Sequence, residues 1–488
     1  MQEMRLKIIL LIYACFWFSH LMIGQDELGI ANSNYSPTTS VYLNPSSLAD
    51  SRVFIDIHLI GAGAAAQNNF IYMPGSEFRI SQLWKDPENV PEPQYKRYFG
   101  PYFVNADANV QGPSATVVLG KNAFGFTTAI RSVVSMHRMP DHLANYAIEG
   151  FRWPDQMTEK FETNRLRAGG LAWAEVGLSY ARIISQQDDG FLSAGISIKR
   201  LIGIAGVGLN IDEWNYSVID TLNLETSKIK GKYGVNEPAF GSGGGWGFDL
   251  GITWKRTEGG ASGYTPHSSS SGCKKLEYID KFSVALIDIG RINFDPDFYS
   301  GEFDSSDTLV WEGYASANPD DLQEITQLID SEFGTQVSGD GAETMALRIG
   351  LPTALTVQYD RHLSRGFYVG GALVQGIAPL SKMGPRRMNQ LAFIPRFERK
   401  RFECSLPLVL REYKYPSFGL MLRLNSIIIG SDKVGNLLFG GQDIYGTDIY
   451  FHLKYSIFSK ASCKGREARS SGGARRSGGR GAKPCPAW

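Results

Sequence analysis

The sequence predicts an all-β fold: a closed antiparallel transmembrane β-barrel of about 14 strands with long loops and one short loop helix. Three observations favour this fold. Apolar residues alternate with small or polar residues along many segments, glycine and aromatic residues are abundant, and the chain starts with an export pattern. The 488 residues include 54 glycines, 27 phenylalanines, 22 tyrosines and 9 tryptophans.

The start of the chain has the pattern of a secretory signal peptide. Arg5 and Lys7 form a short basic region, and an apolar stretch follows at residues 8–23. A basic start, an apolar middle and a small residue at the end are typical of export signals. The alternative is a transmembrane anchor, but the stretch contains Ser19 and His20 and is short for a membrane span. We therefore expect a signal peptide at residues 1–24.

Composition excludes several classes of protein. Lysine plus arginine and aspartate plus glutamate both number 49, so the formal net charge is zero. This balance excludes a globally basic nucleic-acid binder and an acidic disordered chain. Beyond residue 24 no apolar run reaches about 18 residues, which excludes a helical inner-membrane protein. The four cysteines after residue 24 do not suggest a disulfide scaffold or a zinc site, and we expect no cofactor.

The last thirty residues differ from the rest of the chain. Residues 459–488 carry eight basic side chains and one acidic one, Glu467, among serines and glycines. A segment of this composition buries too little apolar surface to order itself. We interpret it as a disordered basic tail, and electrostatic attachment to phosphates is the alternative.

Alternation with a period of two is clearest at residues 246–255. Trp246, Phe248 and Leu250 share one face with Ile252 and Trp254, whereas glycine, aspartate, threonine and lysine occupy the other face. Successive side chains of a strand point to opposite sides of the sheet, so one face is apolar and the other polar or small. Similar alternation occurs at residues 53–59, 124–131, 175–180, 192–199, 355–360, 418–424 and 449–457.

Short turn motifs join neighbouring segments of this kind. Gly120-Lys121-Asn122, Asp188-Asp189-Gly190 and Ser364-Arg365-Gly366 each separate two alternating segments. Such short connections predict antiparallel hairpins between consecutive strands. We expect loops at residues 74–113, 139–164, 256–272 and 295–342, and a helix at residues 320–333 that packs on the barrel mouth or binds a partner.

The polar face of these strands suits the wet interior of a barrel. It alternates glycine, serine and threonine with isolated charges, whereas the Trp/Phe/Leu face suits lipid. Closure into a barrel is required, because an open sheet edge cannot lie in hydrocarbon. The charged residues of the polar face are candidates for lining a solute path, or they pair across a filled interior: Glu175, Lys199, Asp249, Lys255, Asp360 and Arg423.

Several segments resemble outer-membrane barrels of the Bacteroidota. Tyr42-Leu43-Asn44-Pro45-Ser46-Ser47 precedes the first strand, as an Asn-Pro-Ser element does in the PorP/SprF-like and FadL-like groups and in an uncharacterised family of unknown function. Residues 282–290, 351–355, 367–370 and 447–458 resemble that last family. The resemblance implies an outer-membrane barrel and no defined substrate. FadL-like barrels hold an N-terminal plug in the lumen, and residues 25–51 would be the plug or lead-in segment here.

Motifs for catalysis are weak. Residues 61–66 imitate a dinucleotide fingerprint, but Asp56 and His58 are incompatible with the buried parallel strand that the fingerprint requires. The sequence therefore predicts a non-enzymatic outer-membrane barrel at residues 52–458. It would transport apolar or small solutes, or act as a structural partner in a cell-surface or secretion assembly. Membrane lipid is the expected partner, and the alternative is an exported soluble β protein that binds a ligand or the cell wall.

Overall fold

The computed structural model describes residues 26–77, 85, 91–96, 101–144, 159–220, 223–257, 261, 266–267, 277–295, 298–306, 308–312, 347–378, 383–435 and 443–458. The expected signal peptide at residues 1–24, the helix at residues 320–333 and the basic tail at residues 459–488 lie outside these ranges.

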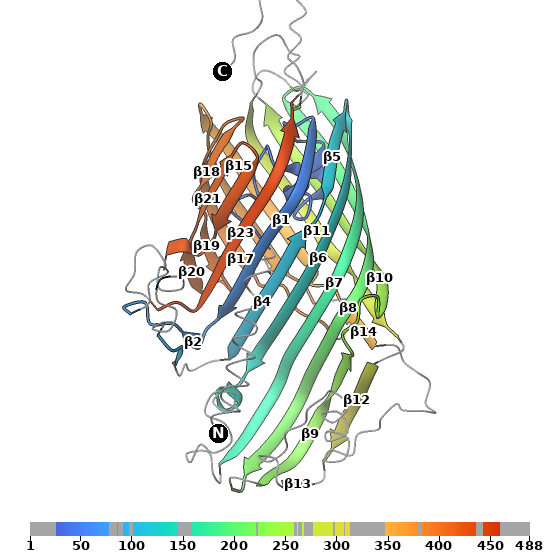
Figure 1. Ribbon diagram of the computed structural model, residues 1–488, viewed down its shortest axis with the longest axis vertical. Helices are drawn as coiled ribbons and strands as arrows, with labels where there is room; N and C mark the ends of the chain where they lie inside the picture. The colour runs from blue at the N-terminus through green and yellow to red at the C-terminus, as the bar shows by residue number, and fades with distance from the viewer. Residues whose placement is uncertain are drawn as a thin grey trace, which may run out of the picture.

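The chain folds into a closed antiparallel barrel whose wall has 14 strands, as the sequence predicts. The strands run obliquely around the barrel, and segments from the two ends of the barrel sequence lie side by side (Figure 1). The elements in chain order are α2 (Pro37–Ser40), η1 (Pro45–Leu48), β1 (Ile55–Asn68), β2 (Ile71–Tyr72), β3 (Gln94–Tyr95), β4 (Tyr102–Gln111), β5 (Ser114–Leu119), β6 (Asn122–Met139), β7 (Lys160–Gln187), β8 (Gly190–Val218), β9 (Asn223–Asn236), β10 (Gly243–Thr257), β11 (Tyr278–Phe294), β12 (Phe298–Ser305), β13 (Leu309–Glu312), β14 (Leu347–Gly350), β15 (Ala354–Ser364), β16 (Phe367–Gly376), β17 (Gln390–Glu398), β18 (Phe402–Ser405), β19 (Leu408–Arg411), β20 (Tyr415–Phe418), β21 (Leu420–Leu424), β22 (Ile427–Ser431) and β23 (Gly446–Ile457).

Pairing between β1 and β23 closes the barrel. Its register runs from Ile55 opposite Ile457 to Gln67 opposite Gly446. On its other side β1 pairs with β4 and β5, which together make one wall strand. Other wall strands also consist of consecutive segments: β9 with β10, β11 with β12 and β13, β14 with β15, β18 with β19, and β20 with β21. The separate hairpin of β2 and β3 lies outside this wall.

The two ends of the barrel differ in their connections. One end, the short-turn end, has two-residue turns after β5, β7, β15 and β21. The three turn motifs predicted the first three of these turns. Gly120 in the first of these turns has φ +64°, a conformation that glycine adopts without steric cost. The opposite, long-loop end holds the connections after β1, β6, β13 and β22. β10 ends and β11 begins at the short-turn end as well, beside the turn between β7 and β8, with residues 258–277 between them.

The predicted orientation of the strand faces is confirmed in β10. Trp246, Phe248 and Leu250 are 54%, 40% and 48% exposed on the outer surface. Asp249 and Lys255, on the other face, are almost completely buried. The same alternation of exposed and buried residues runs through β6, β7 and β8. The outer face is therefore apolar and the inner face carries the polar groups.

Two of the predicted loops contain complete wall segments, and these predictions were wrong. Residues 74–113 include β4, in which small residues, Ala106 and Ala108, alternate with Asn105 and Asp107. The alternation is present, but it is difficult to detect in the sequence because the residues of the outer face are only weakly apolar. Residues 295–342 include β12 and β13, which are rich in polar side chains. Among the described residues these two strands pair only with β9. Residues 139–164 also contain the first residues of β7.

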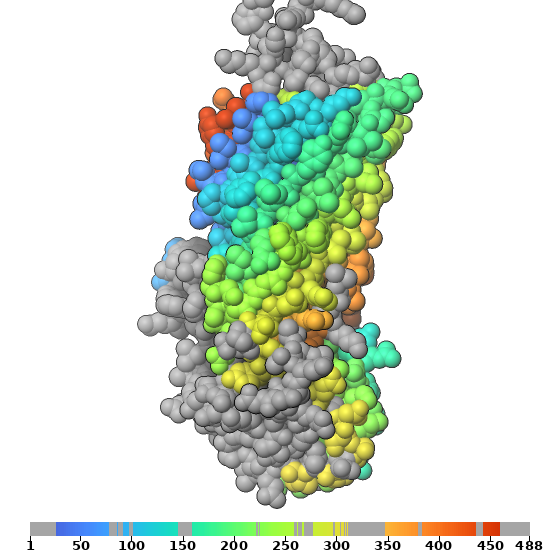
Figure 2. Space-filling view, turned by 90° about the vertical axis from the view of Figure 1, so that its right-hand side faces the viewer, coloured from blue at the N-terminus to red at the C-terminus, as the bar shows by residue number. Residues whose placement is uncertain are grey.

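Strands β7, β8 and β9 continue beyond the rest of the wall at the long-loop end (Figure 1). β7 and β8 have 28 and 29 residues, whereas about 10 residues suffice to cross a bilayer with tilt. Figure 2 shows the oblique strands on this side of the outer surface, with segments of β9 and β12 at the projecting end. Among the described residues, no helix has the length and apolar character that a membrane span requires.

Candidate functional site

The interior of the barrel is occupied by the N-terminal segment (residues 26–54), which lies near the short-turn end (Figure 1). Both of its helices are single turns, and each begins with a proline, at Pro37 and Pro45. Proline suits the first helical position, where its missing N–H would have no partner within the helix. The Asn44 side chain caps η1 by accepting a hydrogen bond of 2.9 Å from the Ser46 backbone N–H.

Side chains of the wall satisfy backbone groups of this segment. The Asp432 carboxylate accepts hydrogen bonds from the backbone N–H groups of Leu28 and Gly29, at 2.8 Å and 3.2 Å. The Thr356 hydroxyl on β15 donates to the Leu43 carbonyl at 2.8 Å. Buried backbone groups outside regular secondary structure are costly unless they have such partners. The inner wall is thus chemically matched to an irregular chain.

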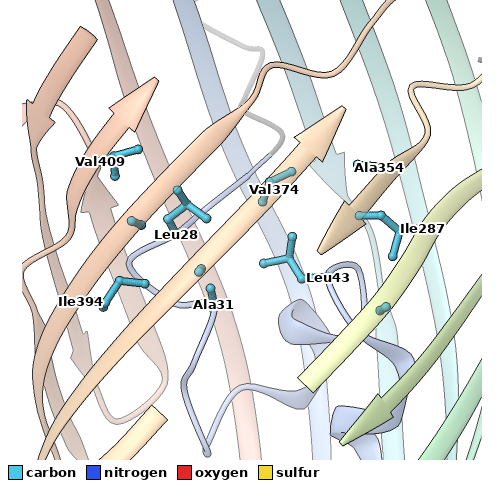
Figure 3. Packing of buried hydrophobic residues seen from close by; sticks show 11 residues of the cluster. Leu28, Ala31, Leu43, Ile287, Ala354, Val374, Ile394 and Val409 are labelled. Carbon is cyan, nitrogen blue, oxygen red and sulfur yellow. The ribbon is translucent and has the colours of Figure 1, made fainter. Parts of the chain in front are cut away.

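Apolar contacts join the same segment to one side of the wall (Figure 3). Leu28 and Leu43 point toward Ile287, Val374 and neighbouring residues, and this cluster is buried. Complete burial of one leucine side chain contributes about 2 kcal/mol. The wall members of the cluster come from β11, β15, β16, β17 and β19: Ala285, Ile287, Ala354, Ala372, Val374, Ala392, Ile394 and Val409.

Glycines of the wall allow the segment to approach the strand backbone. A Cβ atom at Gly251 on β10 would lie 2.1 Å from Asn44 Oδ1. A Cβ atom at Gly195 on β8 would lie 2.5 Å from the backbone nitrogen of Ser46. Both distances are shorter than any real Cβ contact, so these positions exclude a larger residue unless the segment moves. The abundance of glycine on the inner face therefore has a local structural reason.

Three of the predicted lumen residues belong to one charge cluster. The Lys199 ammonium lies 2.7 Å from the Asp249 carboxylate and 2.9 Å from that of Asp288. Arg131 donates to Asp288 through Nη1 at 2.9 Å and through Nη2 at 2.8 Å, and its Nη1 lies 3.3 Å from the Glu175 carboxylate. All five side chains are buried on the inner face. The sequence did not predict Asp288 as a site residue, yet it lies at the centre of this cluster.

The other predicted residues lie apart from that cluster. Asp360 forms two parallel hydrogen bonds with Arg396, at 2.7 Å and 2.8 Å. Arg423 donates to Glu403 at 2.9 Å, and Ser33 of the N-terminal segment donates to the same carboxylate at 2.8 Å. A buried pair of this kind is compensated as long as both partners are present.

Lys255, the sixth predicted residue, pairs with the N-terminal segment directly. Its ammonium group contacts the Asp50 carboxylate, which also lies 3.1 Å from Lys281 on β11. A cleft beside Asp26, Asp448 and neighbouring residues has room for a few water molecules. The structure thus places all six predicted residues in ion pairs on the inner face of the barrel, and it brings three of them together in one cluster.

The sequence contains an indication that Asp288 faces the interior of the barrel. Asp288 shares its parity with Phe282, Val284 and Leu286, so simple alternation would turn it toward lipid. The register between β10 and β11 shifts between Phe248 and Leu250, and Asp288 has φ +55°. Such a bulge inserts one residue and reverses the parity of the strand. A charged residue on the apolar parity indicates where this shift occurs.

Comparison with known proteins gives a family and no function. Residues 45–432 match the model of a family of unknown function, DUF5723. The chain belongs to this family. Because the DUF5723 match covers most of the barrel, the predicted membership in an uncharacterised barrel family is confirmed. The relation to PorP/SprF-like barrels and an origin in the Bacteroidota stay predictions. No curated protein matches the chain.

Solved structures show distant similarity. The P. putida toluene transporter TodX is 9% identical with a TM-score of 0.37, and the match covers 87% of this chain and 95% of that one. The Ralstonia pickettii toluene transporter TbuX is 8% identical with a TM-score of 0.38, covering 86% and 93%. A Pseudomonas aeruginosa FadL homologue is 11% identical with a TM-score of 0.27, covering 89% and 98%. At these sequence identities and TM-scores, the similarity to the solved structures assigns no role to this chain.

Proposed function

We propose that this DUF5723 protein is an outer-membrane channel for apolar or small solutes, closed in the present state by its N-terminal segment. The observation that carries the proposal is the apolar inner wall beneath Leu28 and Leu43 (Figure 3). Only Phe54, at the end of the N-terminal segment, forms backbone–backbone hydrogen bonds with wall strands among the described residues, to Ile457 and Val118. The rest of the segment can therefore leave the wall, whereas the wall strands cannot. Its departure would open a lumen and expose this apolar surface to a solute.

The outer surface supports a position in the membrane. Trp246 and Trp254 mark the two ends of the exposed apolar face of β10. They are eight residues apart, so they lie about 26 Å apart along the strand, which corresponds to about 20 Å across the membrane at a strand tilt of about 40°. Aromatic residues typically border the apolar band of an outer-membrane barrel, which is about 25 Å tall. Arg200 stacks on Trp246 at 5.3 Å, a suitable place for a cation that reaches the lipid headgroups.

The inner surface supports an apolar solute. A second buried apolar cluster lies on the inner face nearer the long-loop end and includes Trp173, Phe294 and Ile349. Barrels that conduct ions usually have polar, water-filled interiors. In this barrel the charges around Asp288 occur in ion pairs, and buried apolar clusters include residues close to Asp288 in the sequence of β11, namely Ile287 and Ile292. Such a wall favours a neutral apolar molecule over a free ion.

A structural role in a surface assembly is the second candidate. The extension of β7, β8 and β9 beyond the wall favours it, because it projects a sheet outside the membrane band (Figure 1). The outward side chains of this sheet form exposed ion pairs such as Lys230 with Asp304. Exposed pairs contribute little to stability, so this surface is free to serve recognition. Neither candidate assigns a reaction to the protein.

A reversible crosslink tests the proposed closure. The Ser46 and Thr253 hydroxyl oxygens lie 2.7 Å apart, on the N-terminal segment and on β10. In the double variant S46C/T253C a disulfide would hold the segment in place. We expect uptake of a small apolar solute by proteoliposomes to stop when the double variant is oxidised and to return on reduction. The single variants S46C and T253C are the controls. Unchanged uptake by the crosslinked protein would contradict a solute path through this lumen.

A further inference from the structure

A second segment enters the lumen from the long-loop end. Residues 383–389, the re-entrant segment, precede β17 and contact the inner face of β6, β7, β8 and β14. Met383 pairs with Ile349 of β14, and its carbonyl accepts a hydrogen bond of 3.0 Å from the Gly350 backbone N–H. The Arg386 backbone N–H donates to the Ser135 hydroxyl on β6 at 2.8 Å. The re-entrant segment therefore contacts wall strands that are far from its own ends.

The opposite wall is shaped to receive this segment. A Cβ atom at Gly169 on β7 would lie 2.5 Å from the carbonyl carbon of Gly384. A Cβ atom at Gly208 on β8 would lie 2.8 Å from the Cβ atom of Met383. These two glycines leave a recess in the wall that the re-entrant segment fills. Gly195 and Gly251 allow the N-terminal segment to approach the wall in the same way.

Arg387 joins the two segments. Its guanidinium binds the Asp26 carboxylate through Nε at 3.1 Å and through Nη2 at 2.7 Å. Its Nη1 donates to Asp288 at 2.8 Å. The side chains of all three residues are at most 3% exposed. One buried cation thus bridges Asp26 of the N-terminal segment, the re-entrant segment and the charge cluster of the wall.

Asp288 and Asp26, the two carboxylates that bind Arg387, differ in the other partners that they have. This difference couples the two segments. Asp288 keeps Arg131 and Lys199 as partners when Arg387 leaves. The hydrogen-bond and ion-pair partners that the structure gives the Asp26 carboxylate are Arg387 and Gln390. Departure of either segment consequently leaves a buried charge of the other without its main partner, which is costly. Once one segment has left, the other is held less tightly.

We propose that residues 383–389 are a second closure of the lumen and that Arg387 ties it to the N-terminal segment, so that the two closures are released together. This inference rests on the proposed channel function and adds its regulation. Coupling of this kind is reciprocal, because each segment changes the stability of the other by the same factor. A solute that displaces either segment would loosen the seal at both ends.

Hydrogen exchange of the full chain in lipid nanodiscs tests the coupling. D26N weakens the bridge from the N-terminal side and leaves residues 383–389 unaltered. We expect exchange at the amides of Arg386 and Asn389 to become about tenfold faster or more, although the substitution lies in the other segment. R387Q should accelerate exchange in residues 28–34 in the same way. R386Q is the matched control, since no ion pair of the Arg386 side chain occurs among the described residues.

Two results would overturn the coupling. One is normal exchange at Arg386 and Asn389 in D26N while residues 28–34 exchange faster. The other is normal exchange at residues 28–34 in R387Q. Unchanged exchange in β6 and β8 verifies that each variant forms the barrel. Because the readout does not involve transport, coupling without solute uptake would reject the channel alone, and uptake without coupling would reject this inference alone.

Discussion

Asp50 of the N-terminal segment and Lys255 of β10 form an ion pair inside the barrel, where their side chains are 2% and 1% exposed. The pair joins a residue that precedes the first strand to a wall strand some two hundred positions later in the chain. Lys281 on the next strand shares the same carboxylate. One acidic residue therefore compensates two buried cations of the wall.

Removal of this carboxylate should destabilise the filled barrel. We expect D50N to lower the free energy of unfolding by about 3–5 kcal/mol, because two buried ammonium groups lose their counter-charge. Urea-induced unfolding in lipid vesicles measures the change. The control D189N alters an exposed aspartate in the turn between β7 and β8 and should leave stability within about 0.5 kcal/mol. Equal stability of the two variants would show that Asp50 does not hold the lysines.

A methyl group at Gly251 should displace the N-terminal segment. The new Cβ atom of G251A would lie 2.1 Å from Asn44 Oδ1, so the segment must move or the strand must bend. We expect a cost of about 1–3 kcal/mol and faster amide exchange at residues 43–48. In the control G371A on β16 the nearest atom, the Ala392 carbonyl oxygen, is 3.4 Å away. Unaltered exchange in G251A would contradict the close approach of the segment to β10.

An arginine in the middle of the outer apolar band should impair insertion. Leu250 lies midway between Trp246 and Trp254 and is 48% exposed. We expect L250R to lose about 2–4 kcal/mol of folding free energy in bilayers, since a charge at the membrane midplane is costly. The control F240R changes an exposed residue between β9 and β10, beyond Trp246, and should cost about 0–1 kcal/mol. Heat-modifiable gel migration reports the folded fraction, and equal fractions would exclude lipid contact at Leu250.

Acidic pH should loosen the sheet that projects at the long-loop end. His142 stacks on Phe161 at 4.7 Å, and burial lowers the pKa of His142 to about 4. The unfolded chain gains a proton near pH 6.5, but the folded one does not, so stability is lost as the pH falls from about 6.5 toward 4. At pH 5 the loss amounts to about 2 kcal/mol.

Protection factors of the amides at residues 160–164, corrected for intrinsic exchange, should therefore fall between pH 7.5 and pH 5. The variant H142Q has no titrating group at this position and should show a smaller change. An equal fall in H142Q would assign the pH dependence to other groups.

Period-two alternation and the short turns predicted the barrel, the direction of its faces and the 14 strands of its wall. Strand β4 escaped the prediction because Ala106 and Ala108 give its outer face little apolar contrast. The pairing of the inner charges also could not be predicted. Lys255 and Asp50 meet only because the chain folds back into its own barrel, and a bulge turns Asp288 inward. These contacts depend on tertiary structure, which local alternation does not encode.

Single-channel conductance in planar bilayers tests the central claim most directly. The full chain and a variant without residues 25–51 would be compared in the same lipid and salt. Closure by the N-terminal segment predicts that the full chain conducts rarely or not at all and that the shortened chain gives stable open channels. If the shortened chain folds, as heat-modifiable migration would show, and still conducts no more than the full chain, removal of the N-terminal segment does not open the lumen, and the central claim is contradicted.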